Sequence, residues 1–74
     1  MKKFNNIDDT VIIDFPVPDY LQSEFEEAER ADISGRDGLY NEIADNIDVI
    51  CKNLNAGGKI TKDQWDMICS RYRM

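Results

Sequence analysis

One stretch of regularly spaced apolar residues constrains the fold of this chain more than any other feature. Between residues 39 and 54 the large apolar side chains recur every three or four positions; they are Tyr40, Ile43, Ile47, Ile50 and Leu54. This spacing places side chains along one side of an α-helix. We therefore predict a helix over residues 37–54, and we expect the rest of the chain to be arranged around it.

A second helix is predicted before this one, over residues 19–31. Its apolar residues Leu21, Phe25 and Ala28 fall on one stripe. Only residues 32–36 separate the two predicted helices, and connections this short join neighbouring helices. The two helices are therefore expected to form an antiparallel hairpin.

A third helix is predicted over residues 62–73. The glycines before it can end the preceding helix. Thr61 has the position of an N-cap, and Gln64 lies where it can complete a capping box. The apolar face of this helix is expected to pack on the central one and consists of Trp65, Ile68, Cys69 and Tyr72.

The first 18 residues are expected to form an extended or briefly helical arm. They contain a β-branched run typical of strands, Val11 to Ile13, but no other segment can pair with it. Pro16 and Pro18 end the arm, because proline fixes its own φ and restricts the residue before it. Packing against the helices is expected for Phe4, Ile7, Ile13 and Phe15. The alternative is that the arm pairs with another copy or with the sheet edge of a target.

Together these elements predict an all-α fold, a small antiparallel three-helix arrangement. The predicted helices are 19–31, 37–54 and 62–73, and the central one contacts both others. We expect a single helical domain, residues 19–74, preceded by the arm, residues 1–18. A chain of 74 residues hides only about 60% of its unfolded surface on folding, so its core is small.

The chain is acidic, with a formal net charge of −6, and the charge is unevenly distributed. Residues 4–29 carry eight acidic side chains and no lysine or arginine, whereas residues 59–74 carry a charge of +2. Binding to phosphate backbones requires a basic surface, so direct binding to nucleic acid is not expected.

Catalytic and cofactor chemistry is not expected, and we predict that the chain is not an enzyme. It contains no histidine, the commonest general base. Cys51 and Cys69 are not arranged as a C-x-x-C pair, and we expect both to be small buried apolar residues rather than a disulfide. Polar residues follow the first lysines where a signal peptide would be apolar, and no run is long enough to span a bilayer. A cytoplasmic location without membrane contact is therefore expected.

Residues 53–64 resemble the calcium-binding loop of the EF-hand family. Gly58 falls on the turn glycine of that family, Ile60 on its central aliphatic position, and predicted helices flank both ends. However, Gly57 replaces a side-chain ligand, and Gln64 replaces the bidentate glutamate. The resemblance implies a degenerate EF-hand-like module with weak calcium affinity or none, and we expect no metal or cofactor.

Three functions follow from these features. The first is a non-catalytic protein-interaction module, with a second copy of the chain among its candidate partners. The second is an acidic decoy or inhibitor of a nucleic-acid-binding protein, analogous to short proteins of phage and mobile elements. The degenerate EF-hand-like module is the third and weakest. The candidate interaction surface comprises the arm and the acidic side of the first helix: Phe4, Ile7, Val11, Ile13, Phe15, Glu24, Glu26 and Glu27.

Overall fold

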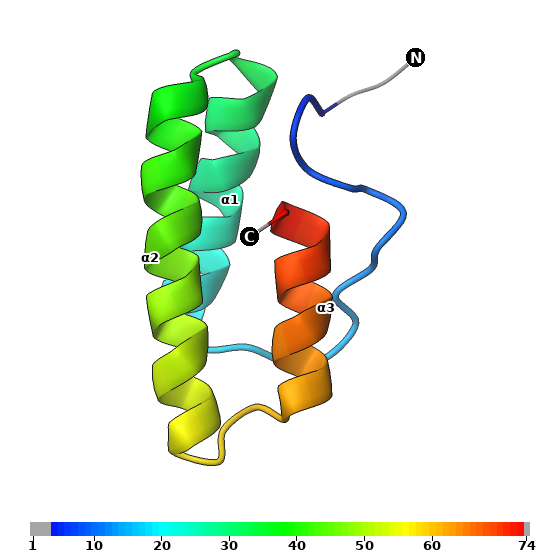
Figure 1. The fold of residues 1–74 in the computed structure, drawn as a ribbon, viewed down its shortest axis with the longest axis vertical. Helices are drawn as coiled ribbons and strands as arrows, with labels where there is room; N and C mark the ends of the chain where they lie inside the picture. Colours follow the sequence, from blue (N-terminus) through cyan, green and yellow to red (C-terminus); the bar gives the residue numbers. More distant parts are fainter. Residues whose placement is uncertain (1–3, 74) are drawn as a thin grey trace.

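The computed structural model describes residues 4–73, and within them it contains three helices connected by short loops (Figure 1). The helices are α1 (Asp19–Ile33), α2 (Asp37–Ala56) and α3 (Lys62–Tyr72). Consecutive helices run in opposite directions, and α2 packs against both α1 and α3. The predicted all-α, antiparallel three-helix arrangement is confirmed.

The helix ends differ from the predicted ones by one or two residues. α1 continues beyond residue 31, because Asp32 stays in the helix and Gly35 makes the turn in the left-handed conformation, with φ of 74°. α2 continues to Ala56, and α3 ends at Tyr72, one residue before its predicted end. The extension of α1 matters for the core, because it adds Asp32 to the buried side of the helix.

The capping box that the sequence predicts at the start of α3 is confirmed. The backbone N–H of Gln64 donates to the Thr61 hydroxyl at 3.1 Å, and the Thr61 N–H donates to the Gln64 side chain at 2.9 Å. Two donors of the first turn, which an isolated helix leaves without partners, are satisfied in this way. The start of α3 is thus fixed by hydrogen bonds between residues only three positions apart.

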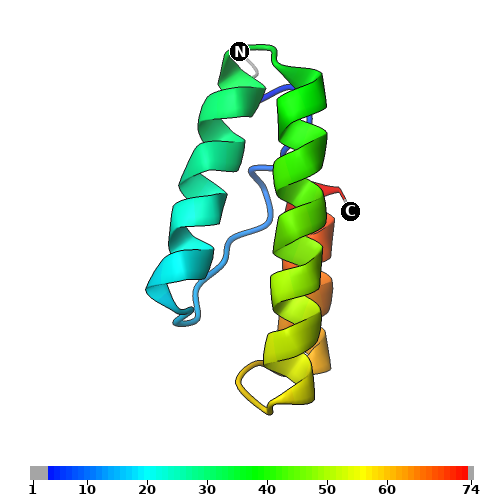
Figure 2. The same cartoon turned by 90° about the vertical axis from the view of Figure 1, so that its left-hand side faces the viewer.

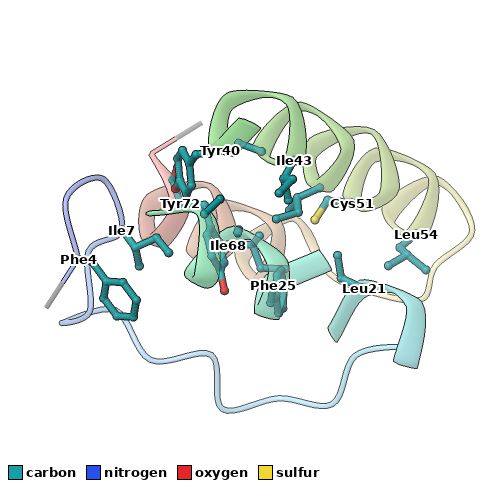
Figure 3. Packing of buried hydrophobic residues seen from close by; sticks show 14 of the residues in the cluster. Phe4, Ile7, Leu21, Phe25, Tyr40, Ile43, Cys51, Leu54, Ile68 and Tyr72 are labelled. Atoms are coloured by element: carbon teal, nitrogen blue, oxygen red, sulfur yellow. The ribbon is translucent and has the colours of Figure 1, made fainter. Parts of the chain in front are cut away.

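The core lies between the three helices and is closed on one side by the arm (Figure 3). Its buried apolar residues are Phe4, Ile7, Leu21, Phe25, Ala28, Ala31, Tyr40, Ile43, Ala44, Ile47, Cys51, Leu54, Ile60, Ile68 and Tyr72. The rings of Phe25 and Tyr72 stack with centroids 4.9 Å apart and connect α1 to α3. The Tyr40 hydroxyl donates to the Tyr72 carbonyl at 2.8 Å and connects α2 to the end of α3.

The described part of the arm, residues 4–18, contains no helix and runs back along α1 and α3 (Figure 1). Phe4 and Ile7 are buried at its far end, with exposed fractions of 6% and 2%. Ile13 and Phe15 are half-buried and pack against the core. The expectation that these four residues cover the helices is confirmed, whereas the brief helical turn that we also considered is absent from the described residues.

Candidate interaction surface

A buried carboxylate, Asp32, fastens the arm to the last turn of α1. Its side chain accepts hydrogen bonds from the backbone N–H groups of Asn5, Asn6 and Ile7 at 2.9, 2.9 and 3.1 Å. The Asn6 side-chain amide donates to the same carboxylate at 2.9 Å, and the Asn5 amide donates to the Asp32 backbone carbonyl at 2.9 Å. Successive backbone N–H groups around one anion form a nest, here closed on a residue of the same chain.

The hydrogen bonds decide the ionisation of Asp32. Burial alone would raise the pKa of this carboxyl, but the backbone and side-chain donors of Asn6, with those of Ile7 and Asn5, favour the charged form more strongly. The pKa of Asp32 is therefore lowered from its ordinary value. At neutral pH the Asp32 side chain is therefore an ionised carboxylate. Its hydrogen bonds to the arm are stronger than those of a neutral carboxylic acid would be.

A second fastening point is Arg71, on the last turn of α3. Its carbonyl accepts from the Asp8 N–H at 2.7 Å, and its guanidinium donates to the Val11 carbonyl at 2.8 Å. The same guanidinium pairs with Glu29 of α1 at 3.2 Å and lies over the Phe4 ring. The side chain of Arg71 is only 14% exposed, so one cation joins the arm, α1 and α3.

Sequence reasoning missed both fastening residues, although the sequence contains a signal for the first. Asp32 continues the apolar stripe of Leu21, Phe25 and Ala28 by the same step of three or four residues. A carboxylate on a core stripe requires donors from another segment, because an unpaired buried charge is costly. For Arg71 we find no comparable signal, because an arginine in a last helical turn also suits the helix dipole.

The predicted surface residues fall into two groups. Those withdrawn from solvent in whole or in part are Phe4, Ile7, Val11, Ile13, Phe15 and Glu24. Those left exposed are Glu26 and Glu27. In this conformation the apolar part of the predicted surface mainly serves the molecule's own core, although Ile12, in the described part of the arm, is 62% exposed.

Another surface that sequence reasoning did not single out lies between α1 and α2. We call it the hairpin face: the side of these two helices turned away from α3 and the arm, and turned toward the viewer in Figure 2. It contains an open hollow of about 330 Å³, lined by Glu27, Arg30, Ala31, Ser34, Arg36, Leu39 and Ile43. Ala31 and Ile43 are buried, and Leu39 remains 42% exposed at the start of α2. The hollow thus combines an apolar floor with a charged rim.

A second hollow, of about 230 Å³, lies where the arm crosses α1 and α3. Its lining consists of Ile12, Ile13, Phe15, Gln22, Phe25, Glu29, Arg71 and Tyr72. The charged groups here already pair with each other, since Arg71 bonds to Glu29 and to the arm. This hollow is part of the packing between arm and helices.

The side chains that could act as nucleophiles, the two cysteine thiols and the Tyr40 hydroxyl, are held in their neutral forms by burial. Burial raises the pKa of the Cys51 thiol to about 12 and also raises that of Cys69, and both cysteines are free thiols. Burial likewise raises the pKa of Tyr40, whose hydroxyl is a donor in the core. A thiol attacks as its thiolate, so neither cysteine is activated as a nucleophile in this environment.

The loop with the EF-hand-like sequence has a different geometry from the one that the resemblance implies. Its first four positions, residues 53–56, continue α2 as helix. The Asn55 side-chain amide N–H donates to the Ile60 carbonyl at 3.2 Å, which ties this side chain to the loop. Among residues 4–73, no three His, Cys, Asp or Glu side chains gather as they would around a metal ion.

Comparison with protein-family models, with curated proteins and with solved structures gives no match for this chain. Within the part that the structure describes, none of the helices combines the length and apolar character needed to cross a membrane.

Proposed function

We propose that this chain is a non-catalytic protein-interaction module that docks a partner protein on its hairpin face. The hollow of about 330 Å³ between α1 and α2 carries this proposal. Its size is at the lower end for small-molecule pockets, and it suits one or two apolar side chains of a partner. Interfaces depend on such anchor sites, in which a few buried side chains supply most of the binding energy.

The composition of the hairpin face supports a protein partner. Leu39 offers exposed apolar area beside the buried floor formed by Ala31 and Ile43. Arg30, Arg36 and Glu27 surround this floor with charges of both signs. An apolar centre within a polar rim is the usual anatomy of a protein interface.

A second candidate, the acidic decoy of a nucleic-acid-binding protein, is supported by the charges that remain unneutralised. Within the described residues only three ion pairs form, and two of them, Glu27–Arg30 and Asp66–Lys62, are long and exposed at 3.9 Å. Exposed pairs of this length contribute little. Most of the acidic surface, including Glu26, therefore remains available to attract a basic partner.

The two candidates can be separated by capture from a nuclease-treated lysate of the native cell, with elution by rising salt. For the hairpin face we expect a partner that stays bound at high salt, because apolar contacts are not screened. The variant Leu39→Asp should weaken its binding at least about tenfold, as loss of a central anchor does.

Val49→Asp is the matched control for this experiment. Val49 lies on the same helix and is 57% exposed, but it does not line the hollow. A partner lost with Leu39→Asp and kept with Val49→Asp supports the hairpin face. Release at moderate salt, together with loss of binding in Glu26→Lys but not in Leu39→Asp, would instead favour the decoy.

A further inference from the structure

The helices form a binding site for the arm, which we call the seat. Within the described chain, the arm is the segment that occupies it. The seat comprises the Asp32 carboxylate, the Arg71 side chain and the apolar surface that Phe4 and Ile7 cover. Every hydrogen bond that this carboxylate accepts comes from the arm. Since a buried charge without donors is costly, the seat requires an extended segment with successive free N–H groups.

The connector between the arm's fastened end and α1 is held by side-chain packing of Ile13, Phe15 and Val17 against the core rather than by hydrogen bonds. Residues 12–17 take part in no hydrogen bond within the described part of the chain. Pro16 is exposed, and Pro18 has an extended backbone, with φ of −60° and ψ of 152°. Prolines favour an extended course for themselves and for the residues before them. Such a connector can lead the arm away from its own helices without breaking a hydrogen bond, at the cost of the packing of Ile13, Phe15 and Val17.

We propose that the arm is exchanged between two copies of this chain. In the exchanged dimer, residues 4–11 of each copy occupy the seat of the other, and residues 12–17 cross between the copies. Each contact of Asp32 and Arg71 with the arm is kept, now between molecules. Reciprocal exchange closes the assembly at two copies, which makes it a low-cost route to a dimer.

Concentration decides which form predominates. Within one molecule a short connector keeps the arm near its own seat at an effective concentration in the millimolar range, so the closed monomer predominates in dilute solution. The exchanged dimer should accumulate when chains fold together at a comparable concentration. Two copies of net charge −6 repel each other, so added salt should increase the dimer fraction.

The first test uses the full wild-type chain, unfolded in urea as an equal mixture of ¹⁴N- and ¹⁵N-labelled protein. The mixture is refolded at ~10 µM and at ~1 mM, which lie below and near the effective concentration of the arm. Native mass spectrometry should find mixed-label dimers at least about tenfold more abundant after refolding at the higher concentration. A wild type that is monomeric at both concentrations overturns the proposal.

The second test asks whether the dimer is held together by the arm of one copy bound in the seat of the other. Ile7→Asp damages the arm and Asp32→Ala damages the seat, so neither variant alone should form the exchanged dimer. Refolded together, they keep one intact arm and one intact seat, on different chains, and should give a heterodimer. Circular dichroism verifies that each variant is still helical.

Two further variants test arm exchange even if Ile7→Asp or Asp32→Ala fails to fold. Pro16→Ala alters only the exposed connector and should lower the wild-type dimer fraction about threefold, because a less extended connector favours closure within one molecule. Leu39→Asp should leave the dimer unchanged. Loss of the dimer in Leu39→Asp, or its full retention in Pro16→Ala, would assign the contact to another surface and overturn arm exchange.

Discussion

At the scale of single residues, Asp32 is the unusual feature of this molecule, because it occupies a core position with a charge. Its exposed fraction is 0%, and the N–H groups of Asn5, Asn6 and Ile7 compensate for its burial. Asp32→Asn would turn an amide toward some of these donors. We expect this change to destabilise the fold by about 1–3 kcal/mol, as measured by urea unfolding at neutral pH.

The pH dependence of stability should report the same residue. The pKa of Asp32 is lower in the folded protein than its ordinary value, so the folded state binds fewer protons than the unfolded chain. The stability from this carboxylate is full above the unfolded pKa of about 3.9 and is lost as the pH falls through the folded pKa. Urea unfolding across this range should therefore show a steeper loss for the wild type than for Asp32→Asn.

Asp8→Asn is the control for the pH experiment. The pKa of Asp8 is also lowered, chiefly by hydrogen bonds from Thr10, but these are local and exposed. Removing Asp8 should leave most of the acid-dependent loss in place. If Asp8→Asn flattened the pH profile and Asp32→Asn did not, the role assigned to Asp32 would be wrong.

At the scale of elements, the three helices differ in how their ends are held. α3 begins with a complete capping box, whereas the caps of α1 and α2, Pro18 and Arg36, make no side-chain cap hydrogen bond. α3 is also the shortest helix, with 11 residues, and a short helix is marginal without local support. The cap thus compensates for a short length.

Replacing Thr61 by alanine tests this role of the cap. Thr61→Ala removes the acceptor for the Gln64 N–H, and we expect a loss of about 1 kcal/mol in the free energy of unfolding. Thr61→Ser keeps a hydroxyl at the N-cap and should unfold within error of the wild type. Equal losses in both variants would mean that the threonine methyl group, and not the cap, is the stabilising part.

At the scale of the whole molecule, α2 is the element on which the others depend, because both α1 and α3 pack against it. Ile47 lies near its middle and is fully buried. Ile47→Asp would bury a charge without a partner, and we expect it to abolish the cooperative thermal transition and most of the helical circular dichroism signal. Val49→Asp, at an exposed position of the same helix, should melt like the wild type. A native melting curve for Ile47→Asp would contradict this placement.

The sequence by itself determined the local structure. The three-to-four spacing of Tyr40, Ile43 and Ile47 is a property of neighbouring residues, as is the pairing of Thr61 with Gln64, so the helices and the cap of α3 could be predicted. Short connections then left an antiparallel arrangement as the natural outcome. The arm's apolar side chains were also correctly expected to cover the helices.

Only the tertiary structure decided how the arm is held and which surface remains free. The nest around Asp32 joins residues 25 to 27 positions apart, and the bond from Arg71 to Val11 spans 60. Periodicity within one element carries no information about such distant partners. The hollow of the hairpin face likewise forms only when α1 and α2 are placed side by side, so neither helix alone contains it. Local sequence specifies the helices, whereas contacts between distant segments specify the surface that a partner can reach.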